Sequence, residues 1–255
     1  MNDIVQQLEG LATTAPETLT ASVLVATGSG RFYTTVPGPT GELLVGWSSA
    51  GIYAVAPVSE LARFLEEHTT GGLGPISKDL PSKQRRQVAA ALESGKLGGL
   101  AVDLSGLTEF QQAVLRKTAD IPPGQLRPYG WVAREIGKPG ATRAVGSALN
   151  RNPVPVLIPC HRVGRSDGTV GQYAYGPEMK RSLLRAEGLD PDAVDEAASR
   201  GVRYLGSATT KIYCHPTCHH ARRIKEANRV ELVDAAKAER AGFRACLVCR
   251  PAVAA

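Results

Sequence analysis

The four cysteines near the carboxy-terminal end constrain this chain more than any other feature. They are Cys214, Cys218, Cys246 and Cys249, which gives the spacing C-x3-C-x27-C-x2-C. Two short-spaced pairs can bring four sulfurs around one tetrahedral ion, while the segment between the pairs builds a small domain around it. We therefore predict one Zn2+ ion in a four-cysteine site.

Three histidines lie close to the first cysteine pair: His215, His219 and His220. Each could in principle replace a cysteine as a ligand. Because four cysteines already complete a tetrahedral shell, we expect the histidines to lie on the surface or to support the ligands from outside the shell. Two disulfides are the alternative interpretation of the four cysteines, but cytoplasmic proteins rarely keep disulfides.

The sequence shows no targeting or membrane-spanning segment. No apolar run approaches twenty residues, and the start, MNDIVQQLEG, lacks the basic-then-apolar order of a signal peptide. We therefore expect a cytoplasmic protein with no membrane partner.

Basic side chains gather in two blocks separated by an acidic stretch. Residues 105–187 hold twelve basic and six acidic side chains, and residues 200–255 hold eleven and four. The residues between them, 188–199, hold four acidic side chains and no basic one. A basic block is often only a solvated surface, but two of them fit two modules that face a polyanion. The predicted domains are 1–104, 105–188 and 200–255, with a linker at 189–199.

The first hundred residues favour a small β-sheet covered by helices. Short runs rich in β-formers alternate with Gly, Pro and Ser, and two helical patterns follow. We find no cysteine or paired catalytic group there, so we predict a supporting role. The expected strands cover 20–27, 31–36, 42–47 and 51–58, and the expected helices cover 58–68 and 82–95.

A helical pattern begins after Leu104. Thr108 and Gln111 have capping-box spacing at the start of a helix expected over 108–122. A second, shorter helix over 129–137 ends at a glycine.

A third helix, expected over 141–151, has two different faces. One face is apolar, and the opposite face holds Arg143, Gly146, Ser147 and Asn150. Apart from Arg143, the side chains on this polar face are small, so the helix can approach a DNA groove closely. Arg143 is the one long side chain that could reach into the groove. Tight packing against another helix of the protein is the alternative interpretation.

The fifth cysteine, Cys160, stands beside His161 in the sequence Pro-Cys-His-Arg-Val. A thiol accepts alkyl groups only as the thiolate, and a neighbouring imidazole can take its proton. A buried cysteine beside a structural histidine is the alternative. The DNA-facing helix just before this pair favours a nucleophile that acts on DNA.

The run RAVGSALNRNPVPVLIPCHRVGRSDGTVGQYAYG, with PYGWVA before it and LLRAEG after it, resembles the catalytic domain of the O6-alkylguanine-DNA alkyltransferases. The resemblance covers about residues 105–188 and extends more weakly to the β-rich start. It implies an α/β (α+β) fold with an RNase H-like amino-terminal domain and a helical, winged-helix-like alkyltransferase domain.

The same resemblance implies a suicide enzyme for DNA repair. One alkyl group would pass from O6-alkylguanine, or from O4-alkylthymine, to a cysteine of the protein, without an organic cofactor. The implied partner is double-stranded alkylated DNA, and the implied state is a monomer.

Roles for single residues follow from the resemblance. Cys160 would accept the alkyl group, His161 would take the thiol proton through a bound water, and Glu187 would orient His161. Asn152 would fix the sulfur, and Tyr129 would face the lesion's phosphate and donate toward the leaving purine. Arg143 would fill the space of the flipped nucleotide. The other implied DNA contacts are Gly146, Ser147 and Arg151, and the implied pocket residues are Val163, Tyr173 and Ala174.

The stretch RYLGSATTKIYCHPTC, followed by ARRIKEANRVELVDAAKAERAGFRACLVCRP, resembles the zinc-binding module of Ada proteins over residues 200–251. This resemblance implies that Cys214 is both a zinc ligand and a second methyl acceptor, for methylphosphotriesters. Thr210 and Arg244 match positions that meet the DNA backbone. Two alternatives are a regulator whose DNA affinity changes when Cys214 is methylated, and a non-enzymatic sensor of alkyl lesions.

Overall fold

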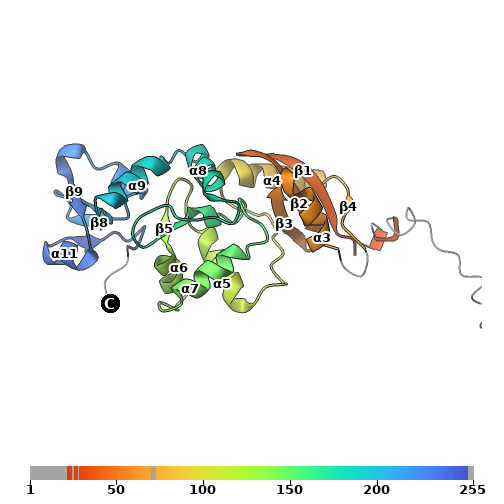
Figure 1. The fold of residues 1–255 in the computed structure, drawn as a ribbon, viewed down its shortest axis with the longest axis horizontal. Helices are drawn as coiled ribbons and strands as arrows, with labels where there is room; N and C mark the ends of the chain where they lie inside the picture. Colours follow the sequence, from red (N-terminus) through yellow and green to blue (C-terminus); the bar gives the residue numbers. More distant parts are fainter. Residues whose placement is uncertain (1–21, 25, 28, 70–72, 252–255) are drawn as a thin grey trace, which may run out of the picture.

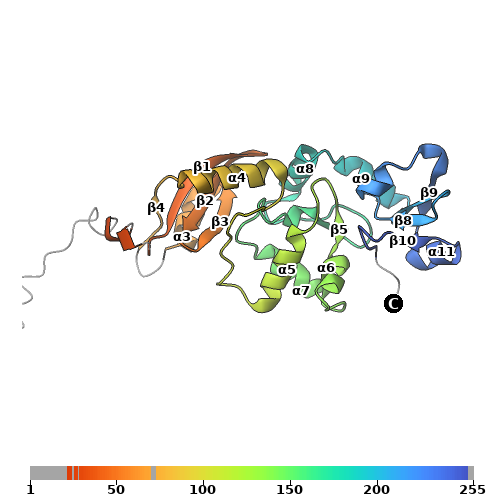
Figure 2. The same cartoon turned by 180° about the vertical axis from the view of Figure 1, so that it is seen from behind.

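The computed structural model describes residues 22–24, 26–27, 29–69 and 73–251. Three units follow one another along its long axis in both views (Figure 1, Figure 2). We call them the sheet unit (29–104), the helical unit (105–199) and the cysteine-rich unit (200–251). The predicted mixed α/β class is confirmed. Within the described residues, no helix combines the length and apolar character that crossing a membrane requires.

The sheet unit is built on four strands in the order β3-β2-β1-β4. Strands β2 and β3 are continuous buried runs because both faces of the sheet are covered, and β1 and β2 pair antiparallel from Phe32 opposite Trp47 to Gly38 opposite Gly41. Strand β3 pairs antiparallel with β2, and the short β4 pairs parallel with β1. The strands are β1 (Phe32–Gly38), β2 (Gly41–Ser48), β3 (Gly51–Pro57) and β4 (Ile76–Ser77).

One helix covers each face of this sheet. Helix α3 (Leu61–Glu67) follows the short 3-10 helix η1 (Val58–Glu60), and its Phe64 packs with Leu44 on one face. Helix α4 (Ser82–Ser94) places Val88 in the core on the other face, with Leu43 and its neighbours. That second core continues into the helical unit, so the sheet unit and the helical unit share one apolar core.

The strand predicted over residues 20–27 is wrong where it can be tested. Residues 22–24 and 26–27 are helical, and the others of this run lie outside the described residues. The hydroxyl of Thr27 donates to the carbonyl of Val23 at 2.9 Å. β-formers need a strand partner to stay extended, and the described residues of this run pair with no strand of the sheet.

The three helices predicted for the helical unit are confirmed as α5 (Glu109–Ala119), α6 (Tyr129–Glu135) and α7 (Thr142–Asn150). The capping box is present, since the Thr108 hydroxyl accepts from the Gln111 amide and the Gln111 side chain accepts from the Thr108 amide. Val114, Val132 and Val145 are fully buried where these helices meet.

The rest of the helical unit carries the Cys-His pair and an ordered connection. The 3-10 helix η2 (Cys160–Arg162) leads into β6 (Val163–Gly164), which pairs parallel with β5 (Arg127–Pro128). Helix α8 (Pro177–Ala186) follows, and then α9 (Pro191–Ser199), which lies in the segment predicted as a linker. Arg181 of α8 bonds Asp192 and Asp195 of α9, so the two helices are tied together.

The cysteine-rich unit holds a second small sheet in the order β10-β8-β7-β9. Strands β8 and β10 are parallel neighbours, so Cys214 at the end of β8 and Cys246 just after β10 come close together. The elements are β7 (Tyr204–Ser207), β8 (Ile212–Cys214), α10 (His219–Arg222), η3 (Glu226–Asn228), β9 (Arg229–Leu232), α11 (Ala235–Arg240) and β10 (Arg244–Ala245).

Candidate active site and zinc site

The Cys160 sulfur is held by the side-chain amide of Asn152, two residues after the end of α7. The Asn152 side-chain NH2 group donates to the Cys160 sulfur at 3.1 Å and to the Ile158 carbonyl at 2.8 Å. Its oxygen accepts from the Val154 amide at 3.1 Å. Val156 in this loop has a φ of 71°, a conformation that a β-branched residue rarely adopts. Asn152 therefore fixes a strained loop and the sulfur together.

The surroundings of Cys160 keep the thiol protonated at rest but stabilise its thiolate. Burial raises the pKa of the Cys160 thiol, while the Asn152 hydrogen bond, the nearby Tyr173 hydroxyl and the charge of Lys180 lower it. The Tyr173 hydroxyl is buried and has no hydrogen-bond partner among the described residues. A base is therefore needed to remove the thiol proton, and the surrounding groups then stabilise the Cys160 thiolate.

The neighbouring His161 is arranged as that base. Its Nε2 lies 2.8 Å from the Glu187 carboxylate, and its Nδ1 has no hydrogen-bond partner among the described residues. An ionised carboxylate can only accept, so Nε2 carries the hydrogen and Nδ1 offers its lone pair. Burial lowers the pKa of His161, whereas Glu187 raises it. A neutral imidazole with a free Nδ1 can take a proton.

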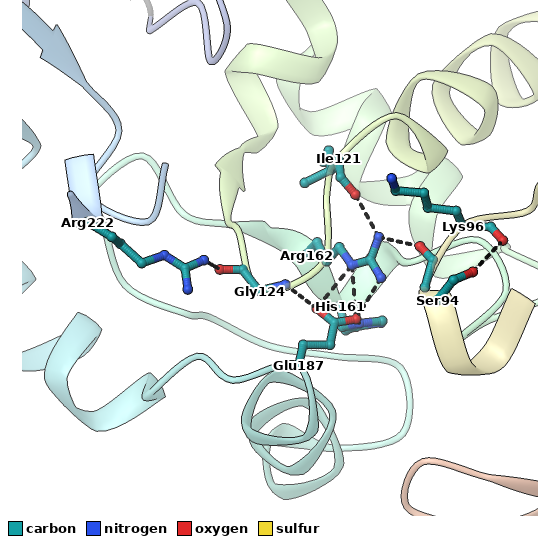
Figure 3. A network of polar contacts seen from close by, with 9 residues as sticks. Ser94, Lys96, Ile121, Gly124, His161, Arg162, Glu187 and Arg222 are labelled. Carbon is teal, nitrogen blue, oxygen red and sulfur yellow. Dashed lines mark hydrogen bonds and ion pairs between the residues drawn. The ribbon is translucent and has the colours of Figure 1, made fainter. Parts of the chain in front are cut away.

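Glu187 ends helix α8 and is surrounded by donors (Figure 3). Besides His161, its oxygens accept from the Arg162 guanidinium at 2.7–3.1 Å and from the Gly124 amide at 2.8 Å. Burial alone would raise the pKa of Glu187, but the hydrogen bonds and charges of His161 and Arg162 lower it to about 2. The carboxylate is therefore ionised and fixed in orientation.

Two buried cations at this site were not assigned roles from the sequence. Arg162 is 1% exposed and also donates to the carbonyls of Gly95 and Ile121, which ties the sheet unit to the site. Lys180 is fully buried, and its ammonium group donates to the Val163 carbonyl at 2.6 Å. Burial lowers the pKa of Lys180 to about 8. A sequence signal existed for Lys180, because it shares an apolar helix face with Leu183 and Leu184.

We expect Glu187 to make the stability of the protein depend on acid pH. Its pKa of about 2 lies below the ordinary 4.5, so its stabilising effect is complete above about pH 4.5 and is lost as the pH falls toward 2. The effect is on the order of 3 kcal/mol. Urea unfolding of Glu187→Gln should show a lower stability at neutral pH and a flatter loss on acidification.

The exposed Glu178 on the same helix provides the control for this measurement. Glu178→Gln should keep the acid dependence of the wild-type protein. If Glu187→Gln loses stability with acid as steeply as the wild type does, the assigned ionic role of Glu187 is wrong.

The predicted DNA-facing residues lie on an accessible face. In α7, Arg143 and Ser147 are exposed, Gly146 is half-buried, and Arg151 is exposed just after the helix. A Cβ on Gly146 would lie 3.9 Å from the ring of Tyr129, so Tyr129 stands beside this helix. Burial, and then the negative charge of a Cys160 thiolate, raise the pKa of Tyr129, which stays protonated. The outer face of α7 and the reactive sulfur thus share one neighbour.

The predicted pocket residues have different exposures. Val163 is fully buried, Tyr173 is half-buried and Ala174 is exposed. The rings of Tyr173 and His161 meet edge to face with centroids 6.4 Å apart. Tyr173 therefore lies between the Cys-His pair and the outside of the protein.

The four cysteines of the cysteine-rich unit fit a zinc ion. Their sulfurs lie within 4.8 Å of one another, and all four side chains are buried. Four sulfurs at about 2.3 Å from a tetrahedral zinc would lie about 3.8 Å apart, so little movement is needed. The backbone amide of His215 donates to the Cys249 sulfur at 3.4 Å, so His215 supports a ligand, while His219 and His220 are exposed.

A hollow of about 580 Å³ adjoins one side of this site. Cys214 and Cys246 are the two zinc ligands that line it. The predicted backbone-contact residues Thr210 and Arg244 line the same hollow, and both are exposed. Arg223 and Lys225 add positive charge there. The hollow thus combines a thiolate ligand with groups that attract phosphate.

Comparisons with known proteins agree with both sites. Residues 109–189 match the family described as "6-O-methylguanine DNA methyltransferase, DNA binding domain", and residues 193–252 match the "Metal binding domain of Ada". The chain is 46% identical over 106 residues to a methylated-DNA–protein-cysteine methyltransferase of Methanosarcina barkeri, covering 40% of this chain and 67% of that protein. The chain belongs to the methylated-DNA–protein-cysteine methyltransferase family. Its cysteine-rich unit is an Ada-type metal-binding domain with one zinc site.

Two further relatives place this methyltransferase chain more closely. It is 41% identical over 154 residues to the regulatory protein Ada of Salmonella typhimurium, covering 58% of this chain and 42% of that protein. The solved structure of Mycobacterium tuberculosis OGT in complex with DNA matches with a TM-score of 0.51 and 29% identity, covering 64% of this chain and 98% of that one. The chain spans about half the length of the curated relatives it matches, from 42% to 67%.

Proposed function

We propose that this methyltransferase repairs DNA by moving an alkyl group from O6-alkylguanine, and from O4-alkylthymine, to Cys160. The arrangement of Cys160, held by Asn152, beside the His161–Glu187 pair carries this proposal. The sulfur forms a bond to the alkyl carbon while the carbon–oxygen bond breaks and its electron pair leaves with the base oxygen. The thiol proton passes through a bridging water to Nδ1 of His161. The thioether has no leaving route, so each protein reacts once.

The substrate in this proposal is double-stranded alkylated DNA, bound by a monomer in the cytoplasm. A thiol that is 8% exposed cannot reach a base inside the stack, so the damaged nucleotide must flip out. Arg143 fills the vacated space, and Gly146, Ser147 and Arg151 meet the duplex. Tyr129 donates toward the leaving base. The pocket for the flipped base comprises Val163, Tyr173 and Ala174.

We assign the domains of this protein as 1–104, 105–188 and 200–255, with 189–199 as the connection. The first supports the second through a shared core and through Arg162, which bonds the Gly95 carbonyl at 2.9 Å. Residues 1–21 and 252–255 of these assignments lie outside the described residues.

A second activity is proposed for Cys214, as acceptor of a methyl group from methylphosphotriesters in the DNA backbone. The observation that favours it is the hollow lined by Cys214, Thr210 and Arg244. Zinc keeps the thiolate of Cys214 ionised at neutral pH. Arg244 and its basic neighbours would hold the phosphate near the sulfur.

One experiment tests both activities. The zinc-loaded chain is incubated with duplex DNA that carries a single O6-methylguanine, and methyl groups are located by peptide mass spectrometry. We expect one methyl group on Cys160, and no methyl group after incubation with lesion-free DNA. An unmodified Cys160 with an intact lesion would defeat the main proposal. The same reaction with methylphosphotriester DNA should methylate Cys214, and an unmodified Cys214 would defeat the second proposal alone.

A further inference from the structure

The cysteine-rich unit forms hydrogen bonds with the loop that precedes β5. Thr217, which lies between two zinc ligands in the sequence, accepts from the Leu126 amide at 2.8 Å and donates to the Leu126 carbonyl at 3.2 Å. Arg222, at the end of α10, donates to the Gly124 carbonyl and to the Thr217 carbonyl. These bonds hold residues 124–126 on the side that faces the cysteine-rich unit, and the bond between Arg222 and Gly124 is drawn in Figure 3.

Glu187 holds the same loop from the inner side. The Gly124 amide donates to Glu187 at 2.8 Å, so Gly124 joins Arg222 through its carbonyl and Glu187 through its N–H. Gly124 has a φ of 64°, and a Cβ there would lie 2.6 Å from the Glu187 carbonyl oxygen and 3.2 Å from the Arg222 guanidinium. Only glycine fits this gap without displacing its neighbours. Gly124 therefore fixes the separation between the Arg222 guanidinium and the Glu187 backbone.

A second group of contacts fixes the same interface at α6. The indole N–H of Trp131 donates to the carbonyl of the zinc ligand Cys249 at 3.0 Å. Arg134 donates to the Arg250 carbonyl at 2.6 Å, and Arg250 pairs with Glu135 at 2.5 Å. The acceptor carbonyls belong to the zinc-binding loop, so this interface requires that loop to be folded.

We propose that the cysteine-rich unit positions Glu187 for alkyl transfer at Cys160, with Arg222 acting through Gly124 as a positioning residue. This inference rests on the proposed function and adds to it a coupling between the two domains. The Gly124 carbonyl and N–H belong to adjacent peptide planes joined at its Cα, so losing the Arg222 bond lets φ and ψ of Gly124 change and turns the N–H away from Glu187. The carboxylate then shifts its hydrogen bonds, and His161 loses part of its alignment. Arg222 touches no reacting atom, so the loss corresponds to about one hydrogen bond, roughly two- to tenfold in rate.

The test measures single-turnover methyl transfer by the full, zinc-loaded chain at increasing concentrations of O6-methylguanine duplex. This separates the maximal rate from the half-saturating DNA concentration. Arg222→Ala should lower the maximal rate about two- to tenfold with the half-saturating concentration unchanged. Arg222→Lys keeps a donor and should restore part of the rate. The matched control is Arg240→Ala, because Arg240 is an exposed arginine of the same unit whose side chain makes no hydrogen bond or ion pair with the described residues.

Thr217→Val provides a second route if Arg222→Ala fails to bind zinc. It removes the bonds to Leu126 with little change in side-chain shape, and its maximal rate should also fall. A wild-type maximal rate in either zinc-loaded variant would overturn the positioning role. A change confined to the half-saturating concentration would also overturn it, because the residue would then act on DNA binding. An inactive wild-type chain would overturn the proposed function instead.

Discussion

Cys160→Ala is expected to lose all methyl transfer from O6-methylguanine, with no measurable residual rate. The other four cysteines of the chain are the buried zinc ligands of another unit, so none can replace the Cys160 sulfur beside Asn152 and His161. Cys160→Ser should be equally inactive, because a hydroxyl ionises far less readily than a thiol and is the weaker nucleophile. Lesion loss from the duplex and methyl mass on the protein are measured together.

The loss in Cys160→Ala should come from chemistry rather than from folding. Replacing a small buried side chain costs about 1 kcal/mol of stability, so the variant should keep its zinc and its affinity for lesion DNA. If Cys160→Ala transferred the methyl group of O6-methylguanine to another of its residues, the assignment of Cys160 would be contradicted. A variant that neither binds DNA nor retains zinc would leave the comparison to Cys160→Ser.

Features encoded by short spacings could be predicted from the sequence. The Thr108–Gln111 capping box, the helix carrying Arg143 and each zinc cysteine pair depend on residues a few positions apart, and the parallel pairing of β8 with β10 brings the two cysteine pairs together. Local geometry decides these features, so the pattern alone was informative.

The carboxylate of the site, Glu187, could not be predicted from local spacing alone. Glu187 follows His161 by 26 positions, and only helix α8 brings its carboxylate to the imidazole. Only the resemblance of the RAEG segment predicts its role. Nothing in the residues between the two positions would have singled it out.

The burial of Arg162 and the docking of the two units could not be predicted from the sequence. Arg162 is stable in the interior because the Glu187 carboxylate pairs with it and the carbonyls of Gly95 and Ile121 reach it from 67 and 41 positions away. The bond between Arg222 and Gly124 joins residues 98 positions apart in different units. Such partners are set by tertiary packing, and an arginine beside a basic block is as typical of a solvated face.

Removing zinc is expected to unfold the cysteine-rich unit and to expose Trp131. The apolar core of that unit is small, with Tyr213, Leu232 and Phe243 as its large members and two alanines completing it. A core of this size does not balance the entropy of ordering the chain, whereas structural zinc contributes about 10–16 kcal/mol. Cys249→Ser should have the same effect, because it removes a ligand whose own carbonyl accepts the Trp131 bond.

Tryptophan emission reports this event, because the chain holds two tryptophans and both are buried. Chelation should shift the emission of Trp131 to the red, since Trp131 is 4% exposed and lies at the interface. Trp131→Phe leaves only Trp47 in the sheet unit, so its emission should not respond to chelation. An unchanged spectrum after verified zinc loss would mean that the unit folds and docks without metal. A red shift, in contrast, would mean that the hydrogen bond between Arg222 and Gly124 also depends on zinc. The same folded unit supplies that bond and the bond between Cys249 and Trp131.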